Sequence, residues 1–143
     1  MSLKYVTCHV YARAMITLKT SVRIPRPIDE VFAYVSDPTR FPVWNSAVRS
    51  VRQTGSTYVM ERDLPTGPAV NELEIVTLER DVEFAIRTTS GPTPFLYRYR
   101  FSEEGAGTLI EFDAEIQLPR LAGPLIKRGI EANLATLVRE FGR

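Results

Sequence analysis

Residues that could carry out chemistry are few in this sequence, and the usual nucleophiles and bases are nearly absent. The chain has one cysteine, Cys8, and one histidine, His9, so any Ser-His-Asp or Cys-His arrangement would depend on His9. These two adjacent soft ligands also fall short of the four placed groups that a zinc site usually needs. No glycine-rich run has the spacing and context of a phosphate-binding loop. We therefore expect no metal and no cofactor, and we assign no catalytic residue.

The best polar candidates lie in a predicted β-hairpin. Residues 95–101, FLYRYRF, alternate in type as a half-buried strand does, and residues 107–118 alternate in the same way. A turn centred on Glu104-Gly105 predicts an apolar face with these opposed pairs: Phe101 with Thr108, Tyr99 with Ile110, Tyr97 with Phe112, and Phe95 with Ala114. The other face then pairs Arg98 with Glu111, with Arg100 and Asp113 as diagonal neighbours. The register is well specified because one face is apolar and the other is charged.

Tyr97 and Tyr99 share the predicted inward face of this hairpin. A buried tyrosine hydroxyl needs a hydrogen-bond partner, so either hydroxyl could meet a ligand in a cavity. The alternative is core packing, in which the hydroxyls bond to the backbone or to water. Both interpretations stay open at this point.

The carboxylates of the central strands offer a weaker basis for catalysis. Glu72 and Glu74 alternate with apolar residues, so we expect both to face solvent, which disfavours a general acid/base pair. Arg62 stands between Glu61 and Asp63, and we interpret this run as solvated charge rather than as a polarising site.

Composition places the chain among ordinary globular domains. The 143 residues suit one domain, with 44% hydrophobic and 24% charged residues. The formal net charge of +1 gives no reason to expect nucleic acid or a charged membrane face as a partner. No apolar run approaches the roughly 20 residues of a membrane span, so we expect a cytoplasmic protein. We also expect a monomer or a homodimer. Residues 1–14 precede the periodic pattern and are interpreted as an N-terminal extension, with an extra edge strand or translation from an upstream start codon as alternatives. A single domain is expected over residues 15–143.

The elements that must position these residues follow from periodicity and turn signals. A strand over residues 17–24 precedes a short helix, IDEVFAYVS, which ends at Asp37-Pro38 because a residue before proline is disfavoured in a helix. PTRFPVW then forms one more helical turn or an irregular segment. Short connections predict an antiparallel meander of strands near 46–54, 57–63, 69–79, 81–89, 94–102 and 107–118.

The chain closes with a predicted long helix over residues 124–141. Its apolar stripe recurs at spacings of three and four and consists of Ile126, Ile130, Leu134, Leu137 and Phe141. Asn133 lies at the edge of this stripe, so its amide either points into a cavity or is solvated. Gly129 inside the helix costs roughly 1 kcal/mol relative to alanine, which suggests close approach to another backbone or a bend.

The segment IPRPIDEVFAYVSDPTRFPVWNSAV resembles the signature of the START-like (SRPBCC) superfamily, the polyketide cyclase/dehydrase and lipid-transport family. The resemblance extends over residues 17–142 and implies the α+β helix-grip fold. In that fold a curved antiparallel sheet wraps around the long C-terminal helix, two short helices follow the first strand, and an apolar cavity remains between sheet and helix. Trp44 would pack under the pair of short helices. The expected ligand-binding residues are Trp44, Phe84, Tyr97, Tyr99, Phe112, Ile130, Asn133 and Leu137.

The resemblance implies binding of a small hydrophobic or aromatic ligand, such as a lipid, a quinone or a polyketide-like molecule. An aromatase/cyclase or dehydratase enzyme is one alternative, and it would need several inward polar groups, of which only Tyr97, Tyr99 and Asn133 are available. A co-chaperone-like interaction module is another alternative, and it would need an exposed apolar or strongly charged patch.

Overall fold

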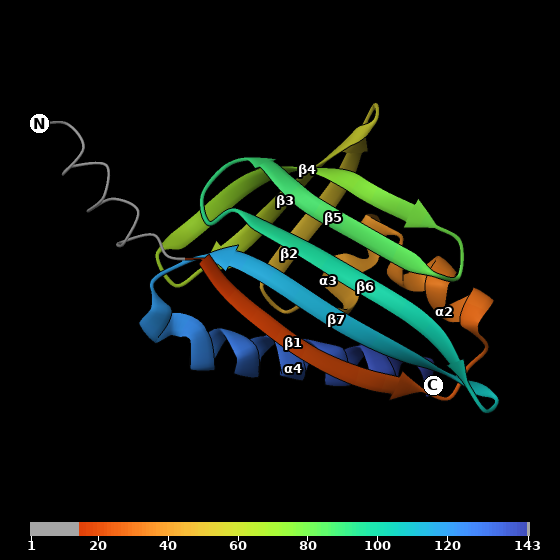
Figure 1. The fold of residues 1–143 in the computed structure, drawn as a ribbon. Helices are drawn as coiled ribbons and strands as arrows, with labels where there is room; N and C mark the ends of the chain where they lie inside the picture. The colour runs from red at the N-terminus through yellow and green to blue at the C-terminus, as the bar shows by residue number, and fades with distance from the viewer. Residues whose placement is uncertain (1–14, 143) are drawn as a thin grey trace, which may run out of the picture.

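The computed structural model describes residues 15–142, so the expectations for Cys8, His9 and the N-terminal extension lie outside the described residues. The elements follow one another in this order: β1 (Met15–Ile24), α2 (Ile28–Val35), η1 (Pro38–Arg40), α3 (Phe41–Trp44), β2 (Val48–Thr54), β3 (Thr57–Leu64), β4 (Gly67–Glu79), β5 (Glu83–Ser90), β6 (Phe95–Glu104), β7 (Gly107–Gln117), η2 (Arg120–Ala122) and α4 (Gly123–Phe141). The predicted helix-grip order is confirmed (Figure 1).

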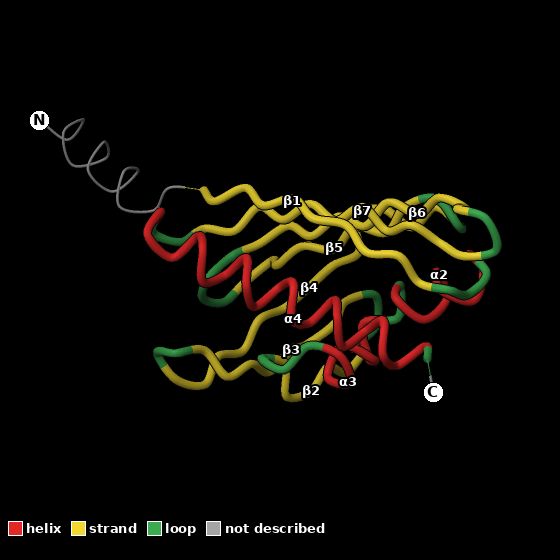
Figure 2. Tube along the Cα trace, turned by 90° about the horizontal axis from the view of Figure 1, so that it is seen from below, coloured by secondary structure: helices red, strands yellow, loops and turns green. Residues whose placement is uncertain are grey.

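The seven strands of residues 15–142 form one antiparallel sheet in the order β1-β7-β6-β5-β4-β3-β2. The predicted meander from β2 to β7 is therefore correct, and β1 completes the sheet by pairing with the last strand, from Met15 opposite Gln117 to Ile24 opposite Thr108. Figure 2 shows the sheet curving around α4, with β7 and β6 on one side of the helix and β3 and β2 on the other. The helix thus lies on the concave face.

The short helices close one end of this curved sheet. Helix α2 stops at the Asp-Pro step, where the Asp37 side chain accepts a hydrogen bond from the Thr39 amide at 3.1 Å and caps the next turn. The chain then turns back through α3, in which Phe41 and Trp44 are buried and their rings meet edge to face at 5.7 Å. The Trp44 ring lies 6.4 Å from that of Tyr99, centroid to centroid. The tryptophan therefore connects the short helices to the sheet.

Helix α4 follows the predicted stripe, with Leu134, Leu137 and Phe141 buried in the core. The expectation that Gly129 approaches another backbone is wrong, because a Cβ placed there would have no atom within 4 Å. None of the helices in residues 15–142 is both long and apolar enough to cross a membrane.

The predicted register of the β6–β7 hairpin is wrong by two residues. The turn lies one residue later than expected, with Glu104 opposite Gly107, and the left-handed conformation in the turn is taken by Gly105 at φ 60°. The observed pairs therefore place Tyr99 opposite Phe112 and Tyr97 opposite Ala114. An even shift keeps every side chain on its predicted face, so the hairpin is still apolar inside and charged outside.

The shift also changes the ion pairs on the outer face. Arg98 lies opposite Asp113 rather than Glu111, and its guanidinium bonds to Glu83 on β5. Arg100 bonds to Asp113 and lies 3.6 Å from the Glu83 carboxylate. Glu83 is thus the shared carboxylate of this face, whereas Glu111 is exposed.

We predict that Glu83→Ala destabilises the protein more than Glu111→Ala. Removing Glu83 takes a carboxylate from two arginines, one of them only 26% exposed, and should cost roughly 1–2 kcal/mol of unfolding free energy. Removing the exposed Glu111 should cost less than about 0.5 kcal/mol. Urea unfolding of both variants measures the difference, and equal losses would contradict the observed pairing.

Candidate functional site

A cavity of about 350 Å³ lies between the concave face of the sheet, α3 and the first half of α4. Its walls are mainly aromatic and aliphatic, including Phe41 and Trp44 from α3, Tyr99 from β6, Phe112 from β7 and Ile130 from α4. Ligand pockets in proteins have about this character, with apolar walls and a small number of placed polar groups.

The exposed members of the lining mark where the cavity opens. On one side is the β3–β4 turn with Pro65 and Thr66, and on the other are Leu125 and Gly129 of α4. Leu125 is 66% exposed although it is apolar. The opening therefore lies between the β3–β4 turn and the first half of α4.

Six of the eight residues predicted to contact a ligand line this cavity, namely Trp44, Tyr97, Tyr99, Phe112, Ile130 and Asn133. Phe84 and Leu137 do not line it, although both are fully buried. Phe84 stacks on Tyr99 at 5.6 Å and so lies against a lining residue. Leu137 belongs to the part of α4 that packs in the core. Phe84 therefore supports the wall from behind, whereas Leu137 contributes to the core.

The two tyrosines present hydroxyls to an apolar space. Burial raises the pKa of Tyr97 and raises that of Tyr99 well above 10, because an apolar site disfavours the phenolate. Among residues 15–142, no protein group forms a hydrogen bond with either hydroxyl. Both groups therefore stay protonated at neutral pH and can donate a hydrogen bond to a ligand oxygen.

Trp44 adds a third donor of the same kind. Its side chain is 4% exposed, and within the described residues its buried indole Nε1 has no hydrogen-bond partner. Nearly all buried donors in native proteins are satisfied, so this unpartnered donor is an exception, and it belongs to a residue that lines the cavity.

Asn133 has its amide oxygen already engaged. Asn133 Oδ1 accepts hydrogen bonds from the Ser46 amide at 3.2 Å and from its hydroxyl at 3.4 Å. The side chain therefore joins α4 to the segment before β2 while lining the cavity. Of the two sequence alternatives, cavity or solvent, the structure places Asn133 at the cavity, with its amide oxygen bonded to Ser46.

Arg62 is the residue that sequence reasoning missed, and its interpretation as solvated charge is wrong. Its side chain is 7% exposed and lines the cavity. Nε donates to Asn71 Oδ1 at 3.0 Å, and Nη2 donates to the carbonyls of Pro92 at 3.0 Å and Thr93 at 3.3 Å. The guanidinium carbon lies 5.3 Å from the centroid of the Phe95 ring. Alternation along β3 was the available signal, because it puts Arg62 on the same face as the buried Met60.

The β5–β6 loop is shaped to hold this arginine. The fully buried Asn71 donates from Nδ2 to the carbonyls of Ser90 at 3.1 Å and Pro92 at 2.9 Å. Gly91 has φ 98°, and a Cβ there would lie 2.3 Å from the Val70 carbonyl oxygen. Thr93 has φ 54°, which is rare for a β-branched residue and costs of order 1–3 kcal/mol. The loop thus accepts strain while turning its carbonyls toward Arg62.

Metal ligands do not gather near this cavity. Within residues 15–142, no three carboxylate, histidine or cysteine side chains lie close enough together to hold a metal ion. Asp63 also contributes to the lining, but its carboxylate bonds to Arg49 at the surface.

The sequence profile of the family described as polyketide cyclase / dehydrase and lipid transport matches residues 15–142. Among solved structures, a START superfamily protein from Mycobacterium smegmatis is 15% identical with a TM-score of 0.68, over 86% of this chain and 92% of that chain. The Zhui aromatase/cyclase from a Streptomyces species is 13% identical with a TM-score of 0.67, over 90% of this chain and 92% of that chain. At these identities the likeness concerns the fold. No curated protein matches significantly.

We predict that Gly91→Ala destabilises the protein by roughly 2–4 kcal/mol, because the new methyl group meets the Val70 carbonyl and the backbone is left-handed. Gly105→Ala is the matched control, since its φ is also positive but no atom lies within 4 Å of its Cβ position. The control should cost about 1 kcal/mol. Equal losses in urea unfolding would show that the contact of the loop with β4 is unimportant.

Proposed function

Because the chain belongs to the polyketide cyclase/dehydrase and lipid transport family, we propose that it binds a small, largely apolar or aromatic ligand in the cavity between the sheet and α4. The observation that carries this proposal is the cavity of about 350 Å³, whose wall combines aromatic rings with a buried, unpartnered indole donor. Cavities of this volume are at the small end of the usual range for ligand sites.

The polar groups of the cavity favour a ligand that carries oxygen acceptors. The Tyr97 and Tyr99 hydroxyls and the Trp44 indole are all donors at neutral pH, since burial disfavours the phenolate forms. A carbonyl or phenol oxygen on an apolar body would satisfy them, whereas a pure hydrocarbon would leave them unpaired. Quinone-like and polyketide-like molecules have this combination.

A cyclase or dehydratase activity is the second candidate function. The same donors could polarise a bound carbonyl, as hydrogen-bond donors do when charge develops on an oxygen. The described part of the lining contains one carboxylate, Asp63, and it is paired with Arg49, so a general base is not evident. Binding without turnover is therefore the better-supported proposal.

The cavity should bind a neutral aromatic probe, N-phenyl-1-naphthylamine, at a single site. Its fluorescence rises on transfer from water to an apolar site, so a titration measures affinity and stoichiometry. Lack of saturable binding would contradict the proposed function.

A matched pair of variants at Gly129 tests whether the probe enters between α4 and the β3–β4 turn. Gly129→Ala should stabilise the protein by about 0.5–1 kcal/mol through helix propensity and leave affinity nearly unchanged. Gly129→Trp fills space at the opening and should weaken binding roughly tenfold. Unchanged probe binding to the tryptophan variant would place the binding site elsewhere.

Tyr97→Phe and Tyr99→Phe should separate ligand recognition from folding. Each change removes one hydroxyl that has no protein partner within the described residues, so unfolding free energy should change by less than about 1 kcal/mol. Affinity for an aromatic ketone such as 2-acetonaphthone should fall about three- to tenfold in at least one variant, while binding of the naphthylamine probe is retained. Equal affinity for the ketone in both variants and the parent would mean that the cavity recognises shape alone.

Because the pKa values of the Tyr97 and Tyr99 hydroxyls are raised, the affinity of the parent protein for 2-acetonaphthone should stay constant between about pH 6 and 9.

A further inference from the structure

We infer that Arg62 is an anion-recognition site in the cavity wall, and that the ligand of this protein carries a carboxylate or a similar oxyanion on its apolar body. This inference rests on the proposed function, because it assumes that the cavity is a binding site. It narrows the ligand from an apolar molecule to an amphipathic acid.

The first reason is that Arg62 is a buried cation without a counter-ion. It is the only charged residue that is buried in residues 15–142, and none of their carboxylates pairs with it. Burying an unpaired charge is expensive, and neutral amide oxygens compensate for only part of that cost. Burial accordingly lowers the pKa of Arg62, although a guanidinium remains protonated in proteins.

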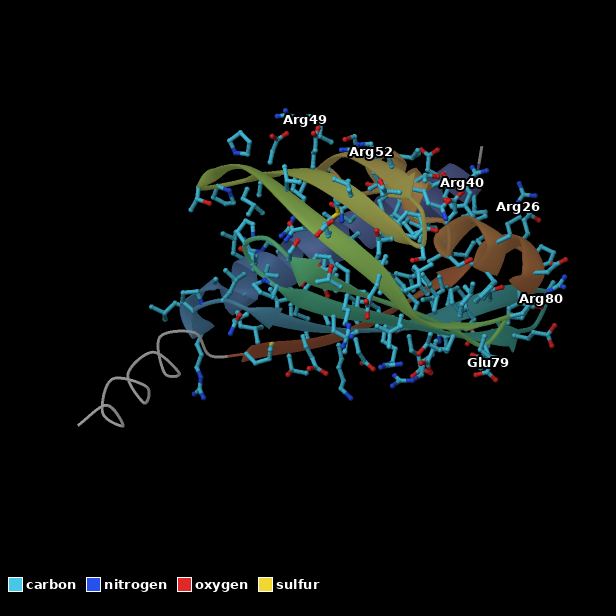
Figure 3. All side chains as sticks on the ribbon, turned by 90° about the horizontal axis from the view of Figure 1, so that it is seen from above. Arg26, Arg40, Arg49, Arg52, Glu79 and Arg80 are labelled. Carbon is cyan, nitrogen blue, oxygen red and sulfur yellow. The ribbon has the colours of Figure 1, made fainter. Side chains whose placement is uncertain are left out.

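Other arginines of the protein show the contrast. Arg26, Arg40 and Arg49 are each within ion-pair distance of a carboxylate, those of Glu30, Asp37 and Asp63 respectively. Figure 3 shows these three side chains at the outside of the molecule. These three exposed arginines pair with acids, whereas the buried Arg62 bonds to neutral acceptors, which leaves its positive charge for a partner that residues 15–142 do not supply.

The second reason is the orientation of the guanidinium. Nε and Nη2 are held by Asn71 and by the carbonyls of Pro92 and Thr93, so one edge of the planar group is fixed. Nη1 forms no hydrogen bond with residues 15–142, which leaves its two N–H groups available beside the cavity. Guanidinium N–H groups bind carboxylate oxygens in short, charge-assisted hydrogen bonds.

The third reason is that the surroundings fit an amphipathic molecule. The Phe95 ring lies against the guanidinium and stacks on Tyr97 with 4.0 Å between centroids. Tyr97 and Arg62 line the same cavity, and the Arg62 charge offsets part of the rise that burial causes in the pKa of Tyr97. An anionic oxygen at Nη1 could therefore accept from Tyr97 while its aromatic or aliphatic body extends along the apolar wall toward Trp44.

A purely structural role for Arg62 would also explain its bonds to the β5–β6 loop. The effect of ligand charge on affinity distinguishes this structural role from anion recognition. We compare 2-naphthoate with 2-acetonaphthone, which is neutral and similar in shape, as competitors of the naphthylamine probe. An apolar cavity alone favours the ketone, because the carboxylate must leave water. The inference predicts that naphthoate binds about tenfold more tightly than the ketone. A ketone that binds as well as naphthoate, or better, would overturn the inference and leave the proposed function intact, whereas failure of the probe itself to bind would overturn the proposed function.

Variants of Arg62 test whether this residue causes the preference for naphthoate over the ketone. Arg62→Met should reduce naphthoate affinity at least tenfold while changing probe affinity less than threefold, and Arg62→Lys should retain part of the preference. Arg87→Met is the control, because that arginine is exposed and bonds to Glu74 away from the cavity lining. If Arg62→Met does not fold, the lysine variant and the competition with the parent protein still decide the question. Undiminished preference in either Arg62 variant relative to the parent, or the same loss in Arg87→Met, would contradict the inference.

Discussion

The concave face of the sheet is wider than the one long helix that covers it, and the rest of the structure depends on how that face is closed. Seven strands at the usual spacing extend about 29 Å across, whereas a helix with its side chains is only about 10–12 Å in diameter. Curvature brings both sides of the sheet toward α4, and the short helices fill one end. The space that remains is the cavity between α3, the sheet and the first half of α4.

This arrangement divides α4 into two parts with different roles. From Leu134 to Phe141 the helix buries its stripe in the core, and Leu134, where the two parts meet, also lines the cavity together with Ile126, Gly129 and Ile130. Trp44 belongs to both regions: its ring packs on Phe41 and Tyr99, and it lines the cavity with an indole nitrogen that has no partner in the described residues. The fully buried part of the stripe thus lies in the second half of α4, and most of the helix's cavity lining lies in its first half.

Much of this fold follows from local signals in the sequence. Alternation, turn residues and the Asp37-Pro38 break predicted all seven strands and the helix order, because those features depend on neighbours in the chain. The hairpin register was missed by two residues because the sequence EEGAG permits more than one turn, and only the left-handed Gly105 defines it. Arg62 was missed because its charged neighbours favoured a solvated interpretation, and its partners come from β4 and the β5–β6 loop. Alternation with Met60 indicates that Arg62 faces inward, but contacts with distant segments leave no local pattern that identifies its partners.

The central claim is that the cavity holds an amphipathic ligand whose charged end meets Arg62. A crystal structure of the protein with 2-naphthoate tests it most directly. The account predicts that the naphthalene ring lies between Trp44, Tyr99 and Ile130, and that a carboxylate oxygen lies about 3 Å from Arg62 Nη1. A naphthoate bound outside the cavity, or one inside it with its carboxylate directed away from Arg62 toward the opening, would contradict the account.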